Sequence, residues 1–155
     1  MHYMAFAPGW EVDTTLAQAA NRNDSMKIQL DTGIGRYLVR AYAPGKITVN
    51  ETVYTSSLVL TPEALIADWT PRAFEELAAA HFDAIAAGKP EVVILGTGAR
   101  LRFPLPACLA PLSRAGIGVE VMDTAAACRT YNILAADGRR VVAALLMIEA
   151  ANNRG

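Results

Sequence analysis

The sequence predicts a small α/β domain, formed by an open sheet with helices and an antiparallel β-meander at its front. Two observations favour this fold. Residues 91–148 alternate apolar strand-like segments with helical segments, and strands joined through helices are normally parallel neighbours with right-handed crossovers. Residues 36–60 instead alternate in polarity across tight turns, which is typical of antiparallel strands with one solvated face.

Length and composition set the class of protein. A chain of 155 residues is long enough for one well-formed core, and its 53% apolar and 19% charged residues exclude a disordered composition. The formal net charge is −1, divided as −3 over residues 1–90 and +2 over residues 91–155. This mild asymmetry provides no basic face for a phosphate backbone, so we expect no nucleic-acid partner.

The sequence also bears on location. The longest apolar run, Val141 to Ile148, is far shorter than the roughly 20 residues that span a bilayer, so we expect no transmembrane segment. Residues 1–25 do not combine a basic end, an apolar run and a cleavage site, so no secretory signal is predicted. Cys108 and Cys128 are the only cysteines and lack metal-binding spacing, which indicates reduced thiols in a cytoplasmic protein.

Three segments divide the chain. Residues 1–25 form an accessory N-terminal tail, because they mix proline, glycine and aromatic residues without a clear period and end in a polar linker. Two interpretations are open for this tail, namely docking through its aromatic side chains and disorder. Residues 26–150 form the single α/β domain, and residues 151–155 form a short polar tail.

Short alternating segments predict the strands of the front third. In one of them Tyr37, Val39 and Ala41 point to the same face, as expected for a half-buried strand. β-Branched residues and turn signals support the others. The expected strands cover residues 26–31, 36–42, 46–49 and 52–60, with tight turns at Pro44–Gly45 and Asn50–Glu51.

Two threonine–proline pairs predict helix starts, since threonine caps a helix and proline suits its first position. Thr61 begins a short helix over residues 64–69, and Thr70 begins a longer helix that ends near Ala87. The longer helix carries an apolar stripe at helical spacing, on which the histidine is expected to pack in the core. The stripe comprises Phe74, Leu77, Ala78, His81, Phe82 and Ile85.

The second half of the chain begins with a strand that is apolar on both faces, as in a sheet covered on both sides. Two prolines introduce the next helix, and Asp123 or Thr124 caps the one after it. The expected order is strand 91–95, helix 107–114, strand 117–122, helix 125–136 and strand 139–148.

A glycine-flanked loop, Gly96-Thr97-Gly98, follows the buried strand and is the first candidate site. Open α/β sheets bind ligands at the carboxyl ends of their strands, and the amide groups of such a loop can cradle an anion. Arg100 lies close by and favours the same small anionic ligand. The dinucleotide fingerprint is incomplete, however, because Leu101 stands where a further glycine is needed.

The helix after residue 123 supplies the second candidate. Arg129 and Asn132 are three residues apart, so they share a helix face. Capping is the structural alternative for the two residues that start the helix, and Arg129 has the alternative of bonding to loop carbonyls. We name the combined candidate the polar loop–helix surface; it comprises Gly96, Thr97, Gly98, Arg100, Asp123, Thr124, Arg129 and Asn132.

No reactive set of side chains is recognisable. The sequence contains no Ser-His-Asp arrangement and no GxSxG motif, and its two histidines, His2 and His81, do not suffice for a histidine metal site. Cys128 lies in mid-helix among alanines, away from a helix start that would activate it. We therefore predict no catalytic residue, no metal and no cofactor, and enzymatic activity is not expected.

Two stretches carry a resemblance to a known family. Residues Val93 to Gly98 and Gly116 to Leu134 resemble a domain family of unknown function that is widespread in bacteria and archaea. That family includes the mitochondrial complex I assembly factor 3 and the adipogenesis-associated domain-containing protein. The resemblance covers about Met26 to Ile148, and its glycine-threonine-glycine loop and Asp-Thr helix start match Gly96 to Gly98 and Asp123-Thr124.

The resemblance implies a three-layer α/β fold with a mixed sheet and a packed β-hairpin, and it implies no established activity or cofactor. Taken with the residues, it predicts an uncharacterised, non-enzymatic binding module that resembles an assembly factor. The alternative is a small-ligand or nucleotide-binding domain with unrecognised enzymatic activity. The expected partner is a protein, a small anionic ligand or a second copy of the chain.

Overall fold

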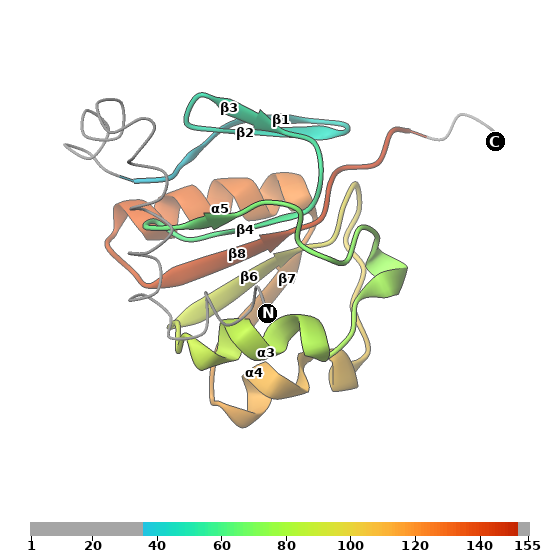
Figure 1. The fold of residues 1–155 in the computed structure, drawn as a ribbon, viewed down its shortest axis with the longest axis vertical. Coiled ribbons are helices and arrows are strands. Elements are labelled where there is room, and N and C mark those ends of the chain that lie inside the picture. The colour runs from blue at the N-terminus through green and yellow to red at the C-terminus, as the bar shows by residue number, and fades with distance from the viewer. Residues whose placement is uncertain (1–35, 152–155) are drawn as a thin grey trace.

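The computed structural model describes residues 36–151 (Figure 1). The predicted strand over 26–31, the tail over 1–25 and most of the tail over 151–155 lie outside these described residues. The elements are, in order, β1 (Val39–Ala43), β2 (Lys46–Val49), β3 (Thr52–Tyr54), β4 (Leu58–Leu60), β5 (Leu65–Ile66), η2 (Phe74–Glu76), α3 (Ala80–Ala87), β6 (Val92–Gly96), η3 (Pro106–Leu109), α4 (Ala110–Arg114), β7 (Gly118–Met122), α5 (Thr124–Ala136) and β8 (Val141–Leu145).

The larger sheet has five strands in the order β5-β4-β8-β6-β7. Strand β6 is parallel to both of its neighbours, β7 and β8, as the helical connections predict. Strand β4 runs antiparallel to β8 and to β5, which makes the sheet mixed. Strand β8 therefore lies at the centre, between a strand from the first half of the chain and a strand from the second.

The layers are visible in Figure 1. Helix α5 covers one face of the larger sheet, and the smaller antiparallel sheet, in the order β1-β2-β3, lies beyond α5 on the same side. Helices α3 and α4 cover the opposite face. This arrangement confirms the predicted three-layer α/β domain with a mixed sheet and an antiparallel β-meander.

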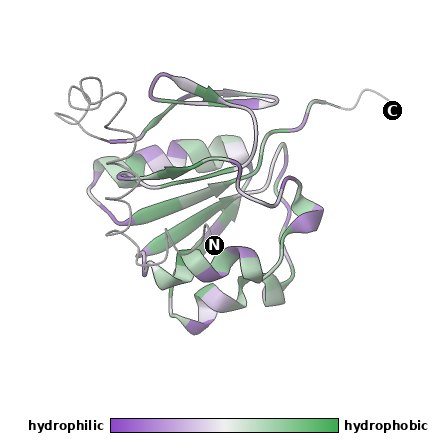
Figure 2. Cartoon of the chain, viewed as in Figure 1, coloured by the Kyte–Doolittle hydropathy of each residue, from purple (hydrophilic) through white to green (hydrophobic). Residues whose placement is uncertain are grey.

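Strand β8 shows how the sheet divides two cores. Val141, Ala143 and Leu145 pack with α5 and the smaller sheet, whereas Val142 and Ala144 pack with α3 and α4. All five side chains are fully buried, since alternate residues of a strand point to opposite faces and both faces are covered. The three inner strands of the larger sheet, β4, β8 and β6, are accordingly hydrophobic along most of their length (Figure 2), whereas the edge strand β7 carries Glu120.

The strand predicted over residues 52–60 is two strands in different sheets. Strand β3 is largely exposed and pairs with β2, whereas β4 is buried on both faces and pairs with β8. The break at Ser57 carries the chain from one sheet to the other, and the Ser57 carbonyl accepts a hydrogen bond from the Trp69 N–H at 2.8 Å. The continuous prediction was wrong because strand propensity does not report which sheet a strand joins.

The prediction that Val39 and Ala41 share one face of β1 is wrong, because the strand contains a bulge. Val39 pairs with Val49 but Ala41 pairs with Thr48, so the register shifts between Val39 and Ala41. The extra residue reverses the phase of the side chains. Ala41 is therefore exposed rather than aligned with buried Val39, and Tyr42 packs against the core instead.

The short helix predicted over 64–69 is wrong. Residues 65 and 66 form β5, which pairs antiparallel with β4. The Thr61 hydroxyl accepts hydrogen bonds from the N–H groups of Ala64 (2.8 Å) and Glu63 (3.1 Å), as a helix cap does. Here the same interaction closes a tight turn between two strands, so the threonine–proline signal does not distinguish the two structures.

The longer predicted helix is interrupted. A 3₁₀ turn (η2) and α3 are separated at Leu77, which has an extended backbone with φ −60° and ψ 135°. Leu77, Phe82 and Ile85 of the predicted stripe are buried, whereas Ala78 is exposed. The helix predicted over 107–114 is likewise a 3₁₀ turn followed by α4, and the last strand is shorter than the predicted 139–148.

Candidate functional site

The loop Gly96–Gly98 lies at the carboxyl end of β6 and contacts the first turn of α5. The Gly98 N–H donates to Thr124 Oγ1 at 2.8 Å, and the Thr124 N–H donates to the Gly98 carbonyl at 2.9 Å. Gly96, Thr97, Gly98 and Thr124 are all buried. The structure thus brings the two halves of the polar loop–helix surface together, but it covers four of its eight residues.

Close packing explains the glycines of this loop. A Cβ atom on Gly96 would lie 2.9 Å from Thr124 Oγ1 and 3.0 Å from Thr124 Cα, so α5 approaches the sheet only because none is present. Gly98 has φ +101°, a conformation that other residues rarely adopt. A Cβ atom there would also overlap the carboxylate of Glu149.

The amide groups of the loop already have acceptors within the protein. The Thr97 N–H donates to the Met122 carbonyl at 2.9 Å, the Gly98 N–H donates to Thr124, and the Ala99 N–H donates to the Glu149 carboxylate. A loop that cradles an external anion needs free donors. Here the side chain of Glu149 supplies the negative charge, so the loop joins β6, α5 and the segment after β8.

Asp123 caps the start of α5, which is the structural role that the sequence offered as the alternative to ligand binding. Asp123 Oδ1 accepts a hydrogen bond from the Ala126 N–H at 2.8 Å, which satisfies one of the free donors of the first turn. The Thr124 hydroxyl donates to the Leu146 carbonyl at 2.7 Å. Both side chains therefore have structural partners.

Asn132 and Arg129 of the polar loop–helix surface contact β1 and not the loop. Asn132 bonds to both main-chain polar groups of Val39, and the Arg129 guanidinium donates to the Tyr42 hydroxyl at 2.7 Å. The partly buried Asn132 thus holds β1 against α5, and Arg129 adds an exposed contact between the same two elements. Arg100 accepts a hydrogen bond from the Thr97 hydroxyl through its carbonyl at 2.7 Å, but its side chain is exposed and forms no hydrogen bond or ion pair within residues 36–151.

The sequence interpretation missed a different surface, which follows the loop directly. Leu101, Phe103 and Leu105 are 47%, 71% and 72% exposed, while Arg102 and Pro104 between them are half-buried. We name these three exposed side chains the apolar loop face. The signal was present in the alternation of large apolar residues with Arg102 and Pro104 after a buried strand, where no further strand or helix begins.

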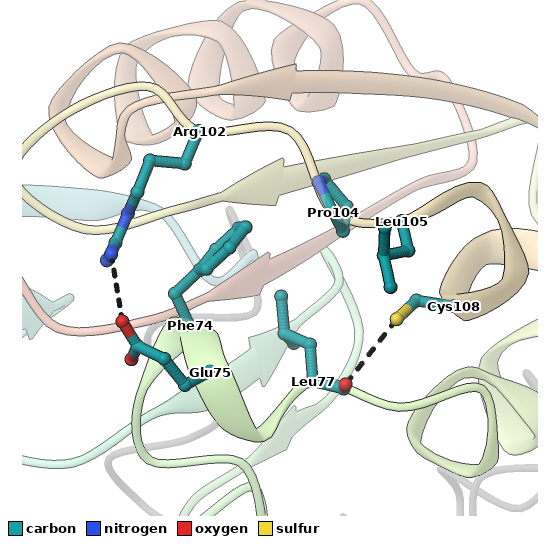
Figure 3. Close-up of a pocket in the computed structure, with 7 residues that line it drawn as sticks. All are labelled: Phe74, Glu75, Leu77, Arg102, Pro104, Leu105 and Cys108. Atoms are coloured by element: carbon teal, nitrogen blue, oxygen red, sulfur yellow. Dashed lines mark hydrogen bonds and ion pairs between the residues drawn. The ribbon is translucent and has the colours of Figure 1, made fainter.

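A hollow of about 300 Å³ lies beside the apolar loop face (Figure 3). The Arg102 guanidinium lies 4.4 Å from the centre of the Phe74 ring and forms ion pairs with Glu75 (3.2 Å) and Glu149 (3.0 Å). Cys108 Sγ lies 3.4 Å from the Leu77 carbonyl on the other side. The lining comprises Phe74, Glu75, Leu77, Arg102, Pro104, Leu105 and Cys108.

The buried titratable groups are structural. Burial raises the pKa of Cys128 to about 12, so its thiol is not an activated nucleophile. Burial also raises the pKa of Tyr131, whose hydroxyl donates to the Tyr37 carbonyl at 2.7 Å. Among the described residues no group of three His, Cys, Asp or Glu side chains is placed to hold a metal ion, and no helix is long and apolar enough to cross a membrane.

Comparison with known proteins identifies the family. Residues 39–146 match the family described as protein of unknown function (DUF498/DUF598). This chain is a member of the DUF498/DUF598 family. The resemblance predicted from the loop and the start of α5 is thereby confirmed, and the match spans the described strands and helices from β1 to the end of β8.

Relatives of this DUF498/DUF598 chain include an assembly factor. NADH dehydrogenase [ubiquinone] 1 alpha subcomplex assembly factor 3 of Danio rerio is 31% identical over 128 residues, which cover 81% of this chain and 72% of the relative. An uncharacterized protein of Rhodobacter capsulatus is 34% identical over 72% of this chain and 86% of its own. The prediction of an uncharacterised module with assembly-factor-like relatives is confirmed.

A solved structure agrees with the fold. The crystal structure of a protein from Bordetella parapertussis matches with a TM-score of 0.69 and 41% sequence identity, covering 73% of this chain and 97% of that one. The arrangement of the mixed sheet and its helices is therefore shared with that solved structure.

Proposed function

We propose that this DUF498/DUF598 chain assists the assembly of a respiratory NADH dehydrogenase by binding one of its protein components. The relative from Danio rerio is named as an assembly factor of that enzyme. The observation that carries the proposal for this chain is the apolar loop face, on which Leu101, Phe103 and Leu105 are exposed side by side along one segment. Contiguous exposed apolar side chains mark binding surfaces more often than single ones do.

The energetics support a protein partner. Burying a leucine or phenylalanine side chain contributes roughly 1.5–3 kcal/mol, so three such residues supply a substantial part of a specific interface. Arg100 precedes the apolar loop face and supplies a charged residue at its edge, as the polar rim of an interface does. Of the polar loop–helix surface, Arg100 is the member that we propose to contact the partner.

A small anionic ligand has less support as the alternative. Its proposed cradle was the Gly96–Gly98 loop, and the N–H groups of Thr97, Gly98 and Ala99 all donate to acceptors within the protein. An external anion would have to displace the Glu149 carboxylate, which is held by the Arg102 guanidinium at 3.0 Å. We therefore propose protein binding and no nucleotide cofactor.

The test is complementation of cells that lack the gene for this protein. A variant with Leu101→Ser, Phe103→Ser and Leu105→Ser should fail to restore the amount of assembled NADH dehydrogenase, measured by native gel electrophoresis of membranes. Ile133→Ser is the matched control, because Ile133 is 64% exposed on α5. Full restoration by the triple serine variant would contradict the proposal, as would normal enzyme levels in the deleted cells.

Self-association is the competing outcome. Sedimentation of the purified chain distinguishes a second copy from a different protein as the occupant of the apolar loop face. A monomer that captures a subunit of the enzyme supports the proposal. A dimer that the triple serine variant dissociates would assign the surface to contacts between two copies instead.

We further propose that the protein works in the cytoplasm. Cys108 and Cys128 are both free thiols, and Cys128 packs in the core on the α5 side of the larger sheet while Cys108 lies in η3 beside Leu77. Free thiols are typical of reducing compartments. Fractionation of cells that express a tagged chain should recover it with cytoplasmic markers, and recovery from an oxidising compartment would contradict this location.

A further inference from the structure

We infer that the apolar loop face binds an extended peptide segment of the partner, which pairs with the main chain of residues 101–103 as an added β-strand. The inference deepens the proposed function, because it rests on the existence of a protein partner and specifies how that partner is recognised. The occupant is an extended segment with apolar side chains at alternating positions and an acidic residue near one end.

Main-chain hydrogen bonding provides the first argument. The Arg102 N–H turns inward and donates to Thr97 Oγ1 at 3.2 Å. In contrast, within residues 36–151 no hydrogen bond involves the N–H or carbonyl groups of Leu101 and Phe103, or the N–H of Leu105. Main-chain groups that are bonded at one residue and unbonded at its two neighbours are typical of an edge strand. Successive residues of such a strand direct their N–H and carbonyl groups to opposite sides.

The prolines keep this segment extended. Pro104 and Pro106 disfavour helical backbone at Phe103 and Leu105, which precede them, and Leu105 has φ −62° and ψ 143°. Pro104 falls on the inward side of this alternation with Arg102, so its missing N–H removes no donor from the exposed edge, where the groups of Leu101 and Phe103 are available to a pairing strand. The available edge is short, which suits a peptide segment better than a long strand of a folded sheet.

Side-chain chemistry specifies the occupant further. Leu101 and Phe103 offer apolar contact, and the hollow beside Leu105 is wide enough for an apolar side chain. On the hollow side, the carboxylates of Glu75 and Glu149 already pair with Arg102, so a further acid there is disfavoured. At the other end Arg100 is exposed and forms no ion pair within the described part of the chain, so it favours an acidic side chain.

The test uses the purified full chain and a phage-displayed library of random linear peptides as the probe. The enriched peptides should alternate apolar residues and carry Asp or Glu at one end. On binding of one such peptide, the amide hydrogens of Leu101 and Phe103 should exchange more slowly in the wild-type chain. Failure to enrich any peptide, or unchanged exchange of both amides with the peptide bound, would overturn the inference.

A matched pair of variants tests the main-chain contact separately. Leu101→Ala and Leu101→Pro both remove the leucine side chain, but only the proline variant also removes the N–H. Leu101→Pro should therefore bind the peptide about fivefold more weakly than Leu101→Ala, since one neutral hydrogen bond contributes about that factor. Equal affinity of two folded variants would overturn the inference; if the proline variant does not fold, the exchange measurement on the wild-type chain decides.

The outcomes separate this inference from the proposed function. Peptide binding through Leu101 and Phe103, together with normal enzyme assembly by the triple serine variant, would retain the inference and overturn the proposed function. Loss of assembly in that variant without any peptide binding would retain the proposed function and overturn the inference. A dimer that Leu101→Pro dissociates would overturn the choice of a partner peptide and assign the edge to a second copy.

Discussion

Asn132 on α5 pairs with Val39 on β1 through both ends of its side-chain amide. Its Oδ1 accepts the Val39 N–H at 2.9 Å, and its Nδ2 donates to the Val39 carbonyl at 2.8 Å. The amide therefore takes the place of a neighbouring strand at the outer edge of β1. It satisfies main-chain groups that would otherwise be unpaired, and it fixes the smaller sheet against α5.

Asn132→Ala should therefore lower the free energy of unfolding by about 1–3 kcal/mol, because it leaves a partly buried donor and acceptor of Val39 without partners. Urea denaturation followed by circular dichroism measures the change. Arg129→Ala is the control, since Arg129 is exposed and its one hydrogen bond among the described residues is to the Tyr42 hydroxyl, and its effect should stay within about 0.5 kcal/mol. Equal midpoints for the two variants would contradict the role given to Asn132.

Gly96→Ala should destabilise the fold by about 1–3 kcal/mol, as overpacking of a close contact does. The added methyl group would lie 3.0 Å from both Thr124 Cα and Leu145 Cδ2, where backbone as well as side chain has to move. Gly118→Ala is the matched control in another strand, because its nearest neighbour is the Glu91 carbonyl oxygen at 4.0 Å. Thermal denaturation of both variants checks the prediction, which fails if Gly96→Ala melts with the wild type.

His81 should make stability depend on pH. Burial lowers the pKa of its imidazole, the charge of Glu76 opposes this shift, and Nδ1 accepts a hydrogen bond from the Ala78 N–H at 3.0 Å. Because the folded pKa lies below the unfolded value near 6.5, the unfolded chain binds the proton first as pH falls. Stability is thus complete above about pH 6.5 and decreases below it.

The measurement is the free energy of unfolding in urea at pH 7.5 and pH 5.5. The wild type should lose more stability between these values than His81→Gln, which cannot take up a proton. A loss of the same size in both chains would show that other groups cause the dependence.

The two cysteines should differ in reactivity. Cys128 is 1% exposed and burial raises its pKa to about 12, so almost no thiolate forms at pH 8. Cys108 is half-buried beside the hollow. Iodoacetamide should modify Cys108 in the native chain and both cysteines in urea, as read by mass spectrometry of peptides. Modification of native Cys128 at the rate of Cys108 would contradict this.

The sequence correctly predicted those elements whose boundaries are set by neighbouring residues in the chain. The buried strand β6, the cap at Asp123 and the end of α5 before Gly138 all follow from residues next to one another. The threonine–proline signal at Thr61 failed because a turn between strands uses the same hydroxyl–amide hydrogen bonds as a helix start. Residue type alone did not decide between them.

The candidate site was harder to predict because its partners are distant in sequence. Asn132 meets Val39 across 93 positions, and Glu149 reaches the amide of Ala99 across 50. The polar residues that were predicted to form a free binding surface therefore already form hydrogen bonds within the protein. Conversely, the sequence alone does not distinguish Phe103 from a core residue, and only the fold shows that none of the strands and helices within residues 36–151 covers it.

The central position of β8 also affects how the protein is made. Its neighbours β4 and β6 precede it in the chain, and they are joined into one sheet only through this strand. A nascent chain that ends at Gly138 therefore has two unpaired strand edges, one on β4 and one on β6. Both strands carry apolar side chains that are buried in the finished fold, such as Leu58 and Ile94. A chain truncated at that point would be prone to aggregation, so we expect cellular proteases to degrade such fragments rapidly.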